Sequence, residues 1–141
     1  MKARSSAQAA RLDLPRAKLL GVTVLTSLDK SDLEATGVNA EPADQVLRLA
    51  LLARQSGLDG CICSPHEIAA LRRECGPDFV LMVPGIRPVG SATNDQKRAM
   101  TPRQAVDLGA THLVVGRPIY QAASPRSAAE AIAREAGVND L

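Results

Sequence analysis

The feature that most constrains the fold is an alternation of apolar runs and helical segments that repeats four times along the chain. Each run is short and rich in aliphatic residues, and the segment after it carries apolar residues at helical spacing. Strands that are apolar throughout are typical of parallel sheets, which are buried on both faces. The sequence therefore predicts an α/β fold in which four parallel strands alternate with helices.

Local start and stop signals place these elements. Prolines fall at first helical positions, glycines follow helical runs, and Ser31, Thr101 and Ser124 stand where N-caps are expected. The predicted strands are residues 18–27, 58–64, 79–83 and 111–116, and the predicted helices are residues 1–12, 31–37, 42–57, 65–76, 101–109 and 124–137.

Two architectures fit this pattern: an open doubly wound sheet, or an arc of a barrel. The strands are too alike in length and in apolar character to decide between them. No linker or change of composition divides the chain, so residues 1–141 are expected to form one structural unit.

Composition excludes several classes of function. The net charge of +2 is spread along the chain, and there is no Trp, one Phe and one Tyr. A basic stripe interleaved with aromatic residues is missing, which disfavours nucleic-acid binding. No apolar run reaches the ~18–20 residues that span a bilayer, and the amino-terminal segment lacks the apolar stretch of a signal peptide. We expect an aliphatic core and no membrane partner.

The three cysteines do not indicate a disulfide scaffold or a metal site. Cys61 and Cys63 alternate within an apolar run, so they share one strand face and are expected to be small buried hydrophobes. Neither His66 nor His112 lies near enough in sequence to complete a ligand set. Free thiols are compatible with the reducing cytoplasm.

Polar residues gather after three of the four predicted strands. Thr26 and Ser27 end the first strand, and Arg87 and Arg117 follow the third and fourth within Gly-Ile-Arg-Pro and Gly-Arg-Pro. Ligands of parallel α/β folds bind at the carboxyl ends of the strands, and a guanidinium beside a small-residue backbone suits a phosphate. Either segment alone fits a plain strand-to-helix turn. Two on successive strands, with Gln96 in the polar loop between them, favour a phosphate site.

The segment "PGIRPVGSATNDQKR", residues 84–98, is longer than a turn requires. Long loops in compact domains are usually functional or disordered. In contrast, the charged group Asp29–Asp32 stands at a predicted helix start, where acidic residues serve as caps. It is interpreted as structural.

The combination of "VTVLTS", "PGIRPVGSATNDQKR", "MTPRQAVDLGA" and "VVGRPI" resembles the carboxyl-terminal half of bacterial orotidine 5′-phosphate decarboxylases over nearly the whole chain. The resemblance implies half of a (β/α)8 TIM barrel, and a cytoplasmic enzyme that converts orotidine 5′-monophosphate to UMP in pyrimidine biosynthesis. It also implies that neither a metal nor an organic cofactor takes part.

The resemblance assigns the phosphate contacts. Arg87 and Arg117 would grip the phosphate together with the Gly116 backbone. Gln96 would reach from the loop toward the phosphate and the pyrimidine. The loop itself would then fold over the ligand as a lid and exclude water.

The resemblance also assigns contacts to the rest of the nucleotide. Thr26 would contact the nucleotide, and Ser27 would hydrogen-bond the pyrimidine ring. Pro84 and Ile86 would line the pocket near the departing carboxylate.

One part of the family pattern is missing. The family's chemistry rests on a D-x-K-x-x-D motif whose Lys protonates the ring carbon, and this motif does not occur in the sequence. A barrel needs ~250 residues, so 141 residues supply about four of its eight units. We therefore expect no catalytic residue in this chain and little or no decarboxylation by it alone.

A four-stranded arc has two edges and an uncovered apolar face, which should drive association. The expected partner is an amino-terminal half or a second copy, and family members are homodimers. Two alternatives stay open: an inactive fragment that binds a nucleotide phosphate or only oligomerises, and a different barrel that acts on a sugar phosphate.

Overall fold

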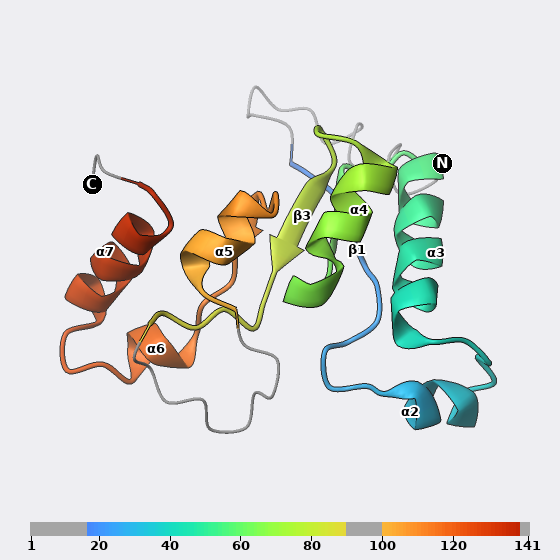
Figure 1. Ribbon diagram of the computed structural model, residues 1–141, viewed down its shortest axis with the longest axis horizontal. Helices are drawn as coiled ribbons and strands as arrows, with labels where there is room; N and C mark the ends of the chain where they lie inside the picture. The colour runs from blue at the N-terminus through green and yellow to red at the C-terminus, as the bar shows by residue number, and fades with distance from the viewer. Residues whose placement is uncertain (1–16, 90–99, 139–141) are drawn as a thin grey trace.

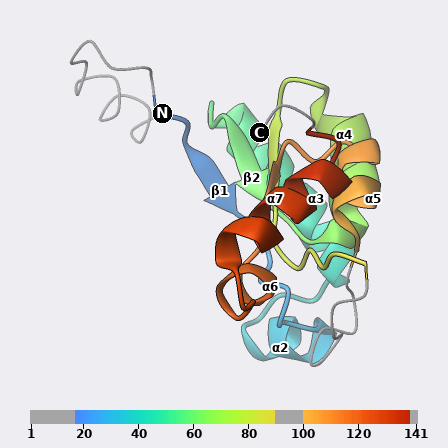
Figure 2. The same cartoon turned by 90° about the vertical axis from the view of Figure 1, so that its left-hand side faces the viewer.

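A computed structural model describes residues 17–89 and 100–138 of the chain. Strands and helices alternate through it, and helices α3, α4 and α5 lie on the opposite side of the molecule from strands β1 and β2 (Figures 1 and 2). The elements in chain order are β1 (Leu20–Val22), α2 (Lys30–Ala35), α3 (Pro42–Gln55), β2 (Gly60–Ile62), the 3₁₀ turn η1 (Pro65–Glu67), α4 (Ile68–Cys75), β3 (Val80–Val83), α5 (Pro102–Asp107), β4 (His112–Leu113), α6 (Arg117–Tyr120) and α7 (Pro125–Glu135).

The four strands form one parallel sheet in the order β1-β2-β3-β4. Val22 pairs with Ile62, Ile62 with Met82, and Met82 with His112, so one row of residues crosses the whole sheet. A doubly wound sheet reverses its strand order at a switch point, whereas a barrel adds each strand beside the one before. The consecutive order therefore decides between the two architectures: the chain forms half of a (β/α)8 barrel.

The strands are shorter than the sequence predicted. The first was expected over residues 18–27 but pairs only over Leu20–Val22. At its end the Thr23 hydroxyl donates to the Ile62 carbonyl at 2.7 Å. Similarly, the Thr111 hydroxyl accepts from Leu81 N at 2.9 Å and donates to Leu81 O at 3.0 Å, just before the two-residue β4. Side-chain hydrogen bonds thus join neighbouring strands at positions where the regular backbone pairing has stopped.

The predicted helix starts are confirmed at Thr101 and Ser124 but wrong at Ser31. Thr101 accepts from Gln104 N at 3.2 Å and so caps α5. Helix α2 is capped by Asp29, whose carboxylate accepts from Asp32 N at 3.1 Å while Asp32 accepts from Asp29 N at 3.0 Å. This reciprocal capping box outcompetes a cap at Ser31, which lies inside the helix. The structural interpretation of the Asp29–Asp32 group is therefore correct.

Other boundaries changed little. The segment 65–76 divides into η1 and α4, and α6 was not predicted. The helix predicted over residues 1–12 lies outside the described residues.

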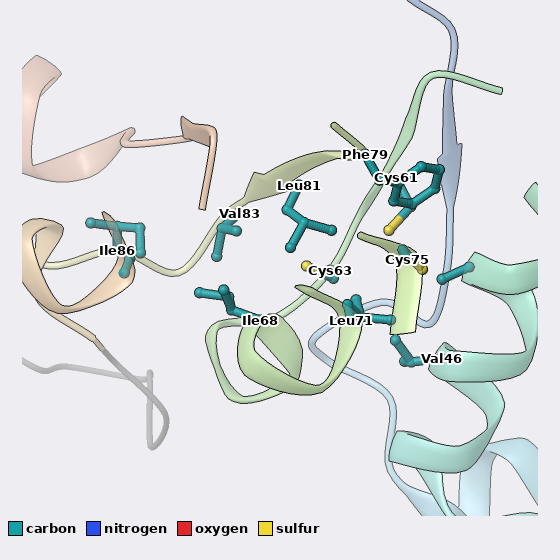
Figure 3. Close-up of a cluster of buried hydrophobic side chains, with 12 residues drawn as sticks. Val46, Cys61, Cys63, Ile68, Leu71, Cys75, Phe79, Leu81, Val83 and Ile86 are labelled. Carbon is teal, nitrogen blue, oxygen red and sulfur yellow. The ribbon is translucent and has the colours of Figure 1, made fainter. Parts of the chain in front are cut away.

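The core lies between the sheet and the helices on its outer side. Cys61 and Leu81 are fully buried and face Ile68 and Leu71 of α4 and Val46 of α3 (Figure 3). Burial of this aliphatic cluster contributes about 25 cal/mol per Å² of apolar surface removed from water. Cys61, Cys63 and Cys75 are all buried and free, as predicted for Cys61 and Cys63.

One arginine ties together the amino-terminal ends of two strands. Arg72 donates to the carbonyls of Gly76, Pro77 and Phe79, which precede β3, and to that of Gly109, which precedes β4. The Nη2–O distance to Gly109 is 2.6 Å. Hydrogen bonds from a charged donor are stronger than neutral ones, so Arg72 fixes the end of the sheet opposite to the predicted ligand site.

No helix among residues 17–89 and 100–138 has the length and apolar character needed to cross a membrane.

Candidate functional site

A cavity of about 160 Å³ opens at the carboxyl ends of β1, β2 and β3. Three residues predicted for the nucleotide, Thr26, Ser27 and Pro84, contribute to its wall. The full lining consists of Val22, Val24, Leu25, Thr26, Ser27, Ile62, Cys63 and Pro84. The structure thus brings two hydroxyls together with an apolar surface, which is a combination suited to one face and one edge of a planar polar ring.

A tight turn presents the two hydroxyls. Leu28 N donates to Leu25 O at 3.0 Å, which makes Thr26 and Ser27 the central residues of the turn between β1 and α2. Both residues are exposed. The turn is followed at once by the Asp29 capping box, so α2 fixes its exit. The hydroxyls are therefore held by backbone geometry and stay accessible to a ligand.

The chain after β3 is anchored before it reaches Gly90. Ile86 forms a parallel bridge with Met100, and Arg87 N donates to Met100 O at 2.9 Å. The Arg87 guanidinium donates to Ile86 O at 2.9 Å, and the side chain is half-buried. The backbone that carries Arg87 is thus fixed to the segment that leads into α5.

Arg117 begins helix α6 directly after β4. The carbonyl of Gly116 accepts from Ile119 N at 2.8 Å, which closes the helical turn, and Pro118 occupies its first turn. Figures 1 and 2 show α6 beside the chain that follows β3. Val114 N also donates to Val83 O at 2.9 Å, so β3 and β4 are still attached to each other where the two arginine segments begin.

Four of the described residues that were predicted for the site do not contribute to the cavity wall: Ile86, Arg87, Gly116 and Arg117. Ile86 is fully buried in the core, and it does not belong to the cavity wall that includes Pro84. Because Ile86 forms a bridge with Met100, its side chain packs between the sheet and the helices. Gln96 lies outside the described residues.

Sequence reasoning missed most of the apolar wall of the cavity. Val22 and Val24 alternate along β1 and its extension, and Ile62 pairs with Val22 on β2. Alternation within the run 18–27 could have identified them, because residues two apart in a strand share a face. However, the run carries apolar residues on both faces, so its sequence does not show which face lines the cavity.

Cys63 contributes to the cavity wall without a reactive thiol. Its hydrogen bond with Cys61 and its burial raise the pKa of the Cys63 thiol, so the thiol stays protonated at neutral pH. Within the described residues, no group of three or more His, Cys, Asp and Glu side chains is arranged to hold a metal ion.

The comparison with known families places the chain. A profile of the orotidine 5′-phosphate decarboxylase / HUMPS family matches residues 1–132. The chain belongs to this family. The family resemblance predicted from the sequence is confirmed.

Individual relatives agree with this assignment. The chain is 54% identical over 114 residues to orotidine 5′-phosphate decarboxylase of Glaesserella parasuis, which covers 81% of the chain and 50% of the relative. It is also 54% identical over 123 residues to the Pseudomonas aeruginosa enzyme, covering 87% of the chain and 53% of the relative. The chain therefore spans about half the length of these decarboxylases.

A solved structure has the same fold, and this chain again matches about half of it. The crystal structure of orotidine 5′-phosphate decarboxylase from Lactobacillus acidophilus superposes with a TM-score of 0.83 at 39% identity. The superposition covers 95% of this chain and 56% of that one. The half-barrel is thus the fold of this family over about half of a decarboxylase chain.

Proposed function

We propose that this chain is the phosphate- and pyrimidine-binding half of an orotidine 5′-phosphate decarboxylase and binds orotidine 5′-monophosphate and UMP. Arg87 and Arg117, with the Gly116 backbone, hold the phosphate. The observation that carries this proposal is the pairing of β3 with β4, because it starts both arginine segments from neighbouring, hydrogen-bonded strand ends. Two guanidinium groups delivered in this way suit a single dianion.

The cavity supplies the other end of the ligand site. Ser27 hydrogen-bonds the pyrimidine ring, Thr26 contacts the nucleotide, and Pro84 packs against the ring near the carboxylate that leaves. The support for these roles is that the three residues share one cavity wall with apolar neighbours. Gln96 adds a contact to the phosphate and the pyrimidine, and Ile86 supports the pocket from the core behind it.

The complete carboxy-lyase reaction needs groups that this sequence lacks. No D-x-K-x-x-D motif occurs in it, so it offers no Lys placed to protonate the ring carbon. Phosphate binding at a distance from the reacting carbon contributes energy that an enzyme can direct to that carbon. The chain supplies this remote binding, and an amino-terminal half supplies the proton donor. The reaction belongs to pyrimidine biosynthesis in the cytoplasm.

Calorimetric titration of the chain with UMP tests the binding proposal. We expect saturable binding that Arg117→Ala weakens by roughly 10- to 100-fold. Arg126→Ala is the matched control, because Arg126 is an exposed arginine on α7 that pairs only with Glu130 among the interactions seen. Binding heats that are equal in both variants, or no binding by the parent chain, would contradict the proposal. The chain would then be a structural fragment without a nucleotide site.

Turnover is measured separately. Orotidine 5′-monophosphate is expected to stay unconverted with the chain alone, because no proton donor is present. Decarboxylation at an enzyme-like rate by the purified chain would overturn the division of roles between the two halves.

A further inference from the structure

Tyr120 is the one tyrosine of the sequence, and none of the proposed phosphate contacts involves it. It is the last residue of α6, which begins at Arg117 directly after Gly116. Its side chain is 65% exposed, so packing in the core does not account for an aromatic residue at this position. A contact with the phosphate segment does.

The ring of Tyr120 lies against Gly116. A Cβ on Gly116 would be 3.6 Å from Cε1 of the ring, which is an ordinary van der Waals distance. Apart from the adjacent residues, the ring is the only group of the described chain within 4 Å of that point. The backbone makes a second connection, because Tyr120 N donates to Gly116 O at 3.2 Å. Tyr120 therefore meets Gly116 through both its side chain and its main chain.

Gly116 is the least restrained part of the backbone that leads to Arg117. The sheet holds the chain as far as Val114, whose N donates to Val83 O at 2.9 Å, and α6 begins at Arg117. Between them Gly116 has φ −107° and ψ −96°, which are not the angles of a helix. Glycine loses more conformational freedom on folding than any other residue. A restraint on Gly116 therefore decides how firmly Arg117 is held.

Helix α6 supplies little of that restraint by itself. It has four residues, and none of them is buried. A first helical turn is unfavourable to form, because several dihedral angles are fixed for one hydrogen bond. Pro118 fixes φ at one position, but this position follows Arg117. The contact of the Tyr120 ring is what packs the end of the turn back onto Gly116.

We propose that Tyr120 is a positioning residue of the phosphate site: its ring packs on Gly116 and so holds the Gly116 backbone and Arg117 ready for the phosphate. This assignment rests on the proposed function and adds a residue to it. The ring acts through Gly116, and the phenol hydroxyl is not required. Because the restraint exists before the ligand arrives, binding does not have to order this segment, and preorganisation of this kind increases affinity.

Calorimetric titration of ring variants with UMP tests the assignment. Tyr120→Ala should weaken binding by about 5-fold, which is the low end of the cost of ordering one backbone residue. Tyr120→Phe should bind like the parent chain, because it keeps the ring. Leu52→Ala is the matched control: Leu52 is 57% exposed and lies on α3. Urea unfolding should show the same stability for Tyr120→Ala and Leu52→Ala, whereas a merely structural role would lower stability and leave affinity unchanged.

Fluorescence gives a second readout that does not depend on a substitution at Tyr120. The chain has no Trp and one Tyr, so its tyrosine emission comes from Tyr120 alone. Ribose 5-phosphate is the probe, because it does not absorb where tyrosine is excited, and ribose is the control. The phosphate sugar should change the emission in a saturable way and ribose should not. Arg117→Ala should move the change to roughly 10-fold higher concentration or more.

The outcomes separate this assignment from the proposed function. Equal UMP affinity in the parent chain and Tyr120→Ala would overturn the assignment alone. An equal loss in Tyr120→Phe would also overturn it, because the phenol would then contact the ligand directly. Emission that ribose 5-phosphate leaves unchanged, in a chain that binds UMP, would place Tyr120 away from the site. A parent chain that binds neither ligand would overturn the proposed function, and the assignment with it.

Discussion

Val83 of β3 pairs with Leu113 of β4, and an arginine follows each of them at the same offset of four residues. Arg87 and Arg117 therefore leave the sheet from paired positions on neighbouring strands. The backbone that carries the two arginines differs: Arg87 follows the bridge between Ile86 and Met100, and Arg117 begins α6.

This relationship predicts non-additive effects on UMP affinity. A hydrogen bond to a charged group contributes about 1.5–3 kcal/mol, so Arg87→Ala and Arg117→Ala should each weaken binding by roughly 10- to 100-fold. If both arginines hold one phosphate, the double variant should lose less than the product of the single effects. Calorimetry on the four proteins measures the coupling. Strictly multiplicative losses would mean that the two side chains bind separate groups.

Arg72 should be a stability residue with no effect on ligand affinity. Arg72→Ala leaves the carbonyls of Gly76, Phe79 and Gly109 without their charged donor, and we expect a loss of about 2–3 kcal/mol in the free energy of unfolding. Arg73→Ala is the control, because this neighbour is 74% exposed and pairs only with Glu74 among the interactions seen. It should change stability by less than ~0.5 kcal/mol. Urea unfolding gives both values, and equal destabilisation would contradict the assignment.

Gly60 should not tolerate a side chain. A Cβ at this position would lie 2.2 Å from the Val80 carbonyl oxygen, which belongs to the neighbouring strand and cannot move alone. Gly60→Ala should therefore cost more than ~2 kcal/mol, since it forces β2 and β3 apart. Gly21→Ala serves for comparison, because its Cβ would meet only side-chain atoms at 3.2 and 3.3 Å. Thermal unfolding should show the larger loss at Gly60; the reverse order would be inconsistent with this packing.

The buried thiols predict a loss of stability at alkaline pH. The hydrogen bond with Cys61 and burial raise the pKa of Cys63, and burial raises the pKa of Cys75. In the unfolded chain these thiols ionise near their ordinary pKa of about 8.5. Above that pH these two thiols bind more protons in the folded state than in the unfolded state, so they make the free energy of unfolding fall as pH rises. The hydrogen bond with Cys63 lowers the pKa of Cys61, and that thiol acts in the opposite direction.

Urea unfolding between pH 7.5 and 9.5 measures this slope. Cys63→Ala and Cys75→Ala should each reduce it, since each removes one thiol that only the unfolded state ionises. The same burial should keep the native thiols unreactive toward Ellman's reagent until the chain unfolds. A slope that neither Cys63→Ala nor Cys75→Ala changes would show that these two thiols titrate alike in both states.

Local signals were sufficient to predict the strands and the described helices other than α6, but not their limits. The Thr101–Pro102 pair predicted the start of α5 because a cap and an N1 proline act within one turn. The run 18–27 overstated β1 because a strand ends where its neighbour stops pairing, and that depends on β2. Asp29 and Ser31 were both plausible caps, and the reciprocal bond with Asp32 decided between them.

Some residues of the candidate site could likewise be predicted from the sequence, and others could not. Thr26 and Ser27 were predicted from their place at the end of a strand and Pro84 from the family resemblance, and the fold gathers all three at one cavity. Ile86 could not be placed from the sequence, because its burial follows from a bridge to Met100 that no local pattern encodes. The choice between barrel and open sheet likewise required the strand order, which is a property of the whole chain.

Arg72 and the two arginines of the proposed phosphate site lie at opposite ends of the same strands. Substitutions around Gly76 and Gly109 can therefore raise or lower thermal tolerance without changing which nucleotide is held at the other rim. Stability and ligand binding can therefore evolve as separate traits in this scaffold. A protein engineer can first optimise stability at the amino-terminal ends of the strands and then change ligand binding at their carboxyl ends.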